Sequence, residues 1–171
     1  MHKGAPTCSE LGIPSHLHRN GRGIDPHFEP EEHYYRRFKR TVHNVPVVGE
    51  DGRISGSIVS TRNMSGNREK YCNSPDDVLY DINSADHFFA WGIWEVKISK
   101  VEGLRFNHPV EARAYTVRVV HEPEDCMYPH SIIRVLENGE PVPRIKSNMV
   151  KTKIREAIAH HTRVIKKPDQ V

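Results

Sequence analysis

Two carboxylates and a lysine in the middle of the chain have the types and the spacing that metal-assisted hydrolysis of a phosphodiester needs. Asp76 follows Pro75, and Glu95 and Lys97 stand two residues apart. If the second pair lies on a strand, its period of two places both side chains on one face. Carboxylate oxygens are ligands for a hard divalent metal ion, and a lysine beside them can position the attacking water.

The order Pro75-Asp76 followed by Glu95-Val96-Lys97 resembles the motif of PD-(D/E)xK nucleases. The resemblance implies that Asp76 and Glu95 would hold a divalent metal ion as cofactor and that Lys97 would assist the attack of water. A motif this short can match by chance in a chain with 27% charged residues. Ser74 before Pro75 also suits the start of a helix, which is the alternative interpretation of Asp76.

A second group of possible ligands follows an expected strand. His121, Asp125, Cys126 and His130 lie within ten residues and offer the imidazole, carboxylate and thiolate groups that zinc prefers. The alternative is structural, with His121 half-buried at a strand end and His130 closing the loop through a hydrogen bond. Cys126 and His130 could also act as a nucleophile and its base, but no third residue is identifiable that would orient them.

Basic residues gather in three places, and each predicts contact with an anion. The proposed anion or nucleic-acid ligands are Arg36, Arg37, Lys39, Arg40, Arg68, Lys151, Lys153, Arg155 and Arg163. Arg68 belongs to the polar stretch 62–72, where Arg62, Asn67 and Lys70 could converge with it on a phosphate. Ordinary solvated or salt-bridged surfaces are the alternative at all three places.

The charge of the chain is uneven. Residues 144–171 hold eight Lys or Arg and two acidic residues, whereas the formal net charge of the whole chain is only +3. The remainder of the chain is therefore slightly acidic. A basic end on an acidic body predicts an anionic partner for that end.

The expected elements follow from periodicity and turn signals. Residues 91–99 alternate Trp94, Val96 and Ile98 with polar side chains and predict a central strand, and 111–121 predict a second one. Asn138-Gly139 predicts a hairpin between 131–136 and an edge strand over 140–145. The remaining expectations are short helices over 30–40 and 74–80, a hairpin over 45–61, a polar loop over 62–72, and a basic amphipathic helix over about 147–165.

These elements predict an α+β fold, with a mainly antiparallel sheet, short flanking helices and a C-terminal amphipathic helix. Residues 1–30, rich in Gly, Pro and His, predict an irregular N-terminal arm, and 31–171 a single domain. Three cysteines without C-x-x-C spacing favour a reducing compartment. With no apolar run long enough for a signal or a membrane span, the expectation is a soluble cytoplasmic protein without a membrane partner. P-loop, dinucleotide-binding and G-x-S-x-G motifs are absent from the sequence.

A looser resemblance extends over about 70 central residues. Asn67-Arg68-Glu69-Lys70-Tyr71, Pro75-Asp76-Asp77-Val78-Leu79, Trp91-Gly92, His121-Glu122-Pro123 and Pro129-His130-Ser131 resemble the skeleton of an uncharacterised family of bacterial proteins with no named activity. The resemblance implies no catalytic residue or substrate. It does imply that Arg68, Tyr71, His121 and His130 belong to one shared site.

The sequence therefore predicts a small non-catalytic binding or accessory module for an anionic partner, RNA or DNA, that uses its basic helix and the Arg36 to Arg40 cluster. Two alternatives stay open. One is the metal-dependent nuclease, and the other is a protein-interaction subunit of a larger complex.

Overall fold

The computed structural model describes residues 4–42 and 44–170. One eight-stranded antiparallel sheet dominates it, with the strand order β10-β5-β1-β4-β8-β7-β6 and with β9 paired to β8. The strands are β1 (His33–Phe38), β2 (Thr41–Val42), β3 (Val45–Pro46), β4 (Met64–Arg68), β5 (Gly92–Lys97), β6 (Arg105–Asn107), β7 (Ala114–His121), β8 (His130–Glu137), β9 (Glu140–Pro141) and β10 (Thr162–Lys166). The α-helices are α1 (Ile98–Val101) and α2 (Asn148–His160), and the 3-10 helices are η1 (Ser15–Leu17), η2 (Gly56–Ile58), η3 (Glu69–Tyr71) and η4 (Pro75–Leu79). The predicted α+β class is confirmed, including the C-terminal helix.

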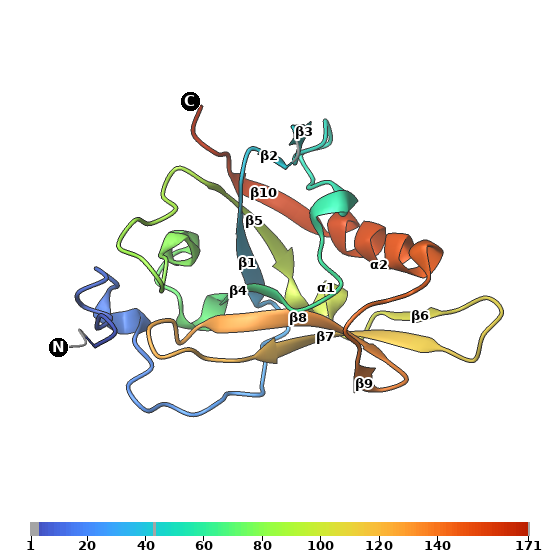
Figure 1. The fold of residues 1–171 in the computed structure, drawn as a ribbon, viewed down its shortest axis with the longest axis horizontal. Coiled ribbons are helices and arrows are strands. Elements are labelled where there is room, and N and C mark those ends of the chain that lie inside the picture. The colour runs from blue at the N-terminus through green and yellow to red at the C-terminus, as the bar shows by residue number, and fades with distance from the viewer. Residues whose placement is uncertain (1–3, 43, 171) are drawn as a thin grey trace.

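The sheet is curled, and α2 lies in the opening that the curl leaves (Figure 1). Strands β1 and β5 run steeply across β7 and β8, and α2 lies beside η2 and β6. Val150, Ile154 and Ile158 are buried along one side of α2, at the spacing that gives a helix an apolar stripe. This stripe fixes which of the basic side chains of α2 face outward.

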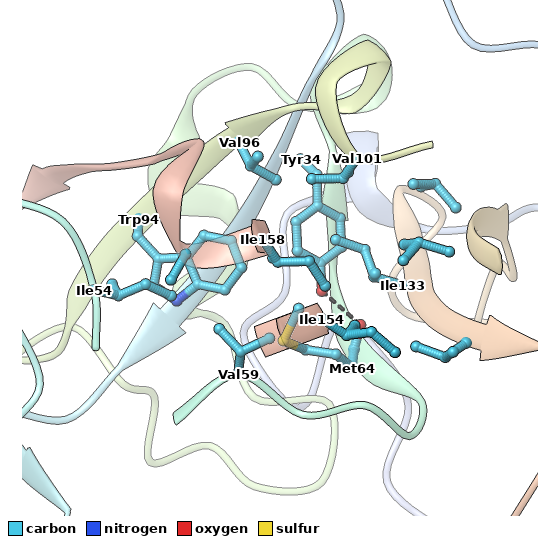
Figure 2. Packing of buried hydrophobic residues seen from close by; sticks show 14 of the residues in the cluster. Tyr34, Ile54, Val59, Met64, Trp94, Val96, Val101, Ile133, Ile154 and Ile158 are labelled. Atoms are coloured by element: carbon cyan, nitrogen blue, oxygen red, sulfur yellow. Dashed lines mark hydrogen bonds between the residues drawn. The ribbon is translucent and has the colours of Figure 1, made fainter. Parts of the chain in front are cut away.

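The main core lies between α2 and the concave side of the sheet (Figure 2). The ring centroids of Tyr34 and Trp94 lie 5.8 Å apart, and the Tyr34 hydroxyl donates to the carbonyl oxygen of Met64 at 2.6 Å. Ile154 and Ile158 of α2 pack over these rings and are fully buried. Burying each such side chain contributes about 1.5–3 kcal/mol to the free energy of folding. The contacts between α2 and the sheet therefore hold the helix in place.

The helix predicted over 30–40 is wrong, because most of this segment is strand β1. Tyr34 and Phe38 point into the main core, while Tyr35 packs on the other face of the sheet against Val78 and Leu79. Proline, early acids and late bases suit a helix start and end, but they carry less free energy than aromatic rings buried on both faces of a sheet. Tertiary packing therefore overrides the local signals.

The polar loop predicted over 62–72 is also wrong, because Met64–Arg68 is the strand β4 between β1 and β8. Its polar residues Asn67 and Arg68 are buried. Gly66 is required for packing: a Cβ atom there would lie 2.4 Å from the Tyr34 ring and from the backbone carbonyl of Tyr35. A polar side chain can be buried when the interior of the protein supplies hydrogen-bond or charged partners, and Arg68 has such partners.

Two further boundaries differ from the prediction. The strand expected over 54–61 is absent; η2 lies there, capped by the Ser55 side chain, and only the bridge Val48–Ile54 remains of the hairpin. The C-terminal helix ends at His160, and Thr162–Lys166 turns back as β10 to pair with β5. Arg163 therefore belongs to the sheet and not to the basic helix.

The strands expected over 91–99, 111–121 and 131–136 are present as β5, β7 and β8, although Ile98 begins α1, and the edge strand expected over 140–145 is only the two residues of β9. Trp94 and Val96 of β5 are buried in the main core, and β7 buries Tyr115, Val117 and Val119 in alternation. Asn138 and Gly139 both have positive φ, as a tight hairpin turn requires, and they join β8 to the two-residue β9. Ser74 caps η4, so the helix start at Pro75-Asp76 is present, although as a 3-10 helix.

The N-terminal arm packs on the body of the protein in its described part. Leu11, Ile13 and Leu17 form a second core with Met127, and Cys8 is joined to Cys126 by a disulfide. Two of the three cysteines are thus paired, which corrects the argument for a reducing compartment. Over residues 4–42 and 44–170, no helix has the length and apolar content that crossing a membrane requires.

Candidate anion-binding groove

A groove lined by positive side chains runs between α2 and the segment that leads into β4. A cavity of about 210 Å³ is lined by Ser60, Thr61, Arg62, Arg144, Ile145, Lys151 and Arg155. A neighbouring cavity of about 450 Å³ shares Thr61 and Arg62 with it and continues along Arg134 and the turn after β9. We call the four cations Arg62, Arg144, Lys151 and Arg155, with Ser60 and Thr61, the basic groove.

The helix start fixes two of these cations. The Ser147 hydroxyl accepts a hydrogen bond from the Val150 amide at 3.3 Å and caps α2. Lys151 and Arg155 are four residues apart, so they share one side of the helix, next to the buried stripe. Lys153 lies two residues on from Lys151, is exposed, and lines neither of the two cavities.

The electrostatics of the basic groove are one-sided. Among the described residues, no carboxylate lines either cavity, and none lies within 4.0 Å of the charged atoms of the four cations. The Nε atom of Arg155 is buried and has no hydrogen-bond partner in the described part of the chain. Because this nitrogen is itself buried, a ligand cannot reach it, and Arg155 contributes to the groove through the part of its half-buried side chain that lines the cavity.

Arg68, a predicted anion ligand, is not available for that role. Its side chain is fully buried, and Nε and Nη2 donate to the two carboxylate oxygens of Glu32 at 2.7 and 2.9 Å. Nη1 donates to the carbonyl oxygen of Asp25 at 2.9 Å, and the ring of Phe28 lies 4.1 Å from the guanidinium carbon. Arg68 is therefore a buried structural cation.

Arg163 is similarly engaged. Its Nε donates to Glu95 Oε1 at 2.9 Å on the neighbouring strand β5. Most of the Arg163 side chain remains exposed, but its charge is directed at a carboxylate. The prediction that Arg163 serves the basic helix fails because β10, and not α2, carries it.

The Arg36 to Arg40 cluster is divided between structural contacts and solvent. Arg37 lies 4.1 Å from the Phe88 ring and donates to the carbonyl oxygen of Val78 at 2.8 Å. Arg36 donates to the carbonyl oxygen of Ser65, and the Lys39 ammonium lies 5.1 Å from the Trp91 ring. Lys39 and Arg40 are exposed. Arg36 and Arg37 belong to β1, Lys39 and Arg40 follow it, and none of the four lines the basic groove.

The three nuclease candidates have separate partners. Glu95 accepts from Arg163, and Lys97 pairs with Glu31. Asp76 is exposed on η4, where its backbone amide donates a hydrogen bond to the Ser74 hydroxyl. None of the three lines the cavities of the basic groove.

The structure does not gather His121, Asp125, Cys126 and His130 into a metal centre. Over the described ranges, no three His, Cys, Asp or Glu side chains are close enough together to hold a metal ion. The sulfur of Cys126 is bonded to Cys8. The His121 ring accepts from the Asp25 amide at Nδ1 and donates from Nε2 to the carbonyl oxygen of Tyr128 at 2.7 Å.

Three of the four residues that the looser resemblance groups together do meet. The Tyr71 and His121 rings stack with centroids 5.7 Å apart, and the Arg68 guanidinium lies 5.1 Å from the Tyr71 ring. Asp25 completes the group, because its carboxylate accepts from the Tyr71 hydroxyl at 2.6 Å and from Lys70 at 2.9 Å. We call Arg68, Glu32, Asp25, Tyr71 and His121 the buried network. The fourth residue, His130, lies outside it and lines another cavity.

The pKa shifts in the buried network have clear causes. The hydrogen bond from Tyr71, followed by that from Lys70, holds the pKa of Asp25 well below its ordinary value. Burial, together with the bond to Asp25, raises the pKa of Tyr71 to about 12. Burial lowers the pKa of His121, so its neutral form is favoured, in agreement with its acceptor role at Nδ1. These shifts favour an ionised Asp25, a protonated Tyr71 hydroxyl and a neutral His121.

Comparisons with known proteins assign no family to the chain. No protein-family model matches it, and searches of curated proteins and of solved structures found no match. The functional conclusion therefore rests on the geometry of this chain.

Sequence reasoning identified Lys151 and Arg155 and noted Arg62, but it missed the groove as a unit. Arg144 and Ser60 carry no motif, and they reach α2 only through the curl of the sheet. The positive charge of residues 144–171 was the signal that could have led to them.

Proposed function

We propose that the protein is a nucleic-acid-binding module that holds the phosphates of an RNA or DNA strand in the basic groove. The observation that carries the proposal is the set of four cations around one groove without a carboxylate among the described residues. Away from these cavities, Arg68, Arg118 and Arg163 have acidic partners, and Arg134, which lines the neighbouring cavity, pairs with Glu122. Cations kept free of such partners are suited to an external anion.

Phosphate groups match the chemistry of the groove. Three of its four cations are arginines, whose planar guanidinium binds phosphate oxygens through two parallel hydrogen bonds. The hydroxyls of Ser60 and Thr61 add neutral donors beside them. Two neighbouring cavities that share Thr61 and Arg62 suit a chain of phosphates better than a single anion.

The test compares two lysines of one helix. Lys151→Gln and Lys153→Gln remove the same charge from α2, but only Lys151 lines the groove. We expect a fluorescence-anisotropy titration with a 12-nucleotide RNA at low salt to show about fivefold weaker binding for Lys151→Gln and little change for Lys153→Gln. Equal losses in both variants would mean that general charge, and not the groove, attracts the strand.

The chemical class of the partner is tested in the same assay. Polyglutamate and vesicles with anionic lipids carry negative charge without a phosphodiester chain. Binding of either one in preference to RNA and DNA would contradict the proposal and favour an acidic protein partner or a membrane surface.

The nuclease alternative has its own experiment. Plasmid DNA with Mg²⁺ or Mn²⁺ is incubated with the protein and with Glu95→Ala. Because Arg163 already binds Glu95, we expect no cleavage that depends on Glu95. Cleavage lost in the variant would instead favour a metal-dependent nuclease that uses Asp76, Glu95 and Lys97.

A cytoplasmic location and a bacterial source stay predictions, and the first is tested by the cysteines. In a reducing compartment, Cys8 and Cys126 would be free thiols despite lying within bonding distance. Alkylation during lysis of the native cells, followed by mass spectrometry, reads their state. Fully oxidised cysteines would place the protein in an oxidising compartment.

A further inference from the structure

A third cavity opens on the opposite side of β4 from the main core. It has a volume of about 350 Å³, within the usual range for small-ligand sites. Strands β1 and β4 form its base, and residues 78–91 and 124–130 form its walls. We call it the aromatic cleft; its lining includes Arg36, Asn67, Phe88, Trp91, Glu124 and His130.

One wall of the aromatic cleft presents aromatic rings. Trp91 is half-buried, and its ring centroid lies 4.5 Å from that of Phe88. Arg37 and Lys39 lie over the two rings, at 4.1 Å from Phe88 and 5.1 Å from Trp91. Rings flanked by cations are the surface on which single-stranded nucleic acids stack their bases.

The base of the cleft offers polar groups that can bond the edge of a flat ligand. Asn67 is 2% exposed; its Nδ2 donates to the Met127 sulfur at 3.2 Å. Within the described ranges, no donor reaches its carbonyl oxygen. The thioether is a weak acceptor and the Cys72 sulfur is a second one, so both acceptors that the protein offers to the Asn67 amide are weak.

His130 and Glu124 extend this polar set. Nδ1 of His130 donates to the carbonyl oxygen of Glu122 at 2.6 Å. Nε2 lies 3.4 Å from a carboxylate oxygen of Glu124. A carboxylate in a cleft with Arg36 repels a phosphate but accepts hydrogen bonds from the amino groups of a base. The polar groups of the cleft therefore suit a base better than a phosphate.

The chain passes directly from the lining of the basic groove to the lining of the cleft. Ser60, Thr61 and Arg62 line the groove, and Ser65, Gly66 and Asn67 line the cleft. Arg62 and Ser65 are three residues apart, which spans at most about 10 Å of extended chain. A short single strand covers this distance, since one single-strand-binding domain takes about 4–16 nucleotides.

We propose that the aromatic cleft takes one unpaired base of a single-stranded nucleic acid, stacked on Trp91, while neighbouring phosphates lie in the basic groove. This inference rests on the proposed function and sharpens it, because it excludes a duplex as the preferred ligand. A base paired inside a duplex cannot reach a stacking position on a protein ring.

The experiment compares three 12-nucleotide ligands: a normal single strand, a strand of the same length with an abasic backbone, and a duplex. We expect the wild-type protein to bind the normal strand at least about tenfold more tightly than the abasic strand. Trp91→Leu should lose this ratio while it keeps its affinity for the abasic strand. Phe89→Leu is the matched control, because Phe89 is an exposed ring two residues away that does not line the cleft.

Tryptophan fluorescence of the wild-type protein provides a readout that requires no substituted variant to fold. Trp94 is 1% exposed, so quenching on addition of a strand reports mainly on Trp91. The normal strand should quench the emission, and the abasic strand should not.

The outcomes separate the two proposals. Equal affinity for normal and abasic strands, or for the duplex and the single strand, overturns the inference and leaves the basic groove intact. An unchanged ratio in folded Trp91→Leu overturns it as well. Failure of all three ligands to bind at low salt overturns both the inference and the proposed function.

Discussion

Arginines occupy two contrasting environments on either side of the segment that carries β4. In the buried network, Arg68 is enclosed and both oxygens of Glu32 accept from it. In the basic groove, Arg155 is half-buried with a buried Nε that has no partner in the described part of the chain. The same side-chain chemistry is thus satisfied internally in one region and left open in the other.

The difference teaches how to separate structural from functional charge. Removing one partner from a buried ion pair strands the other charge in a medium of low polarity, so the pair is required for folding. A cation that faces a groove costs little to replace, because water solvates what remains. Substitutions in the buried network should therefore lower stability, whereas substitutions in the basic groove should weaken binding and leave stability almost unchanged.

The largest expected effect is on stability, in the buried network. Arg68→Leu leaves the Glu32 carboxylate, 4% exposed, without its partner. We expect a loss of about 3–5 kcal/mol in the free energy of unfolding, measured by urea denaturation. The control is Arg118→Leu, which breaks an exposed pair with Glu102 and should cost less than about 1 kcal/mol. Similar losses in both variants would contradict the assignment of Arg68 as a structural residue.

The next effect is on binding, in the basic groove. Arg62→Gln combined with Arg144→Gln should weaken binding of a single-stranded RNA by about tenfold or more at low salt, because two phosphate contacts are lost. Both side chains are exposed, so the urea midpoint should stay within experimental error of wild type. A variant that loses stability but keeps its affinity would mean that Arg62 and Arg144 serve folding and not binding.

A smaller stability effect is expected at the edge of the buried network. Tyr71→Phe removes the hydrogen bond to the Asp25 carboxylate, and we expect a cost of about 1 kcal/mol in the free energy of unfolding. NMR titration should also show the pKa of Asp25 rising toward its ordinary value, since this bond is the main cause of its depression. An unchanged Asp25 pKa would mean that Lys70 and Arg68 hold the carboxylate without Tyr71.

The smallest effect concerns pH. Burial depresses the pKa of His121 in the folded state below its ordinary value of 6.5, so between the two values the unfolded chain binds more protons. This contribution to stability is fully present above about pH 6.5 and is lost as the pH falls through the folded-state pKa. We expect unfolding measured from pH 7.5 to 5 to show a weaker loss of stability in His121→Phe than in wild type. Parallel curves would show that other groups cause the acid sensitivity.

The sequence predicted those elements whose periodicity and burial agree. The alternating residues of β5 and β7 and the Asn138-Gly139 turn carry their own local signals. The prediction failed where burial contradicts local polarity. β4 buries Asn67 and Arg68, and β1 buries aromatic rings on both faces, so neither follows a simple alternating pattern.

The candidate site was only partly visible for the same kind of reason. The spacing of Lys151 and Arg155 on a helix is a local signal, but the position of Arg62 and Arg144 beside them depends on how the sheet curls around α2. Arg163 was misplaced because the helix ends at His160 and the chain turns back as a strand. Trp91 was identified as part of the central strand, yet it lies before β5 and lines the cleft.

The central claim is that the basic groove holds phosphates, and the salt dependence of binding tests it most directly. Each phosphate neutralised on a single strand contributes about 0.7 to the slope of log affinity against log salt. Lys151→Gln combined with Arg155→Gln should therefore reduce the slope by about 1.4 relative to wild type, whereas Lys153→Gln should leave it unchanged. A double variant with the wild-type slope would contradict the claim, because the groove would then make no phosphate contacts.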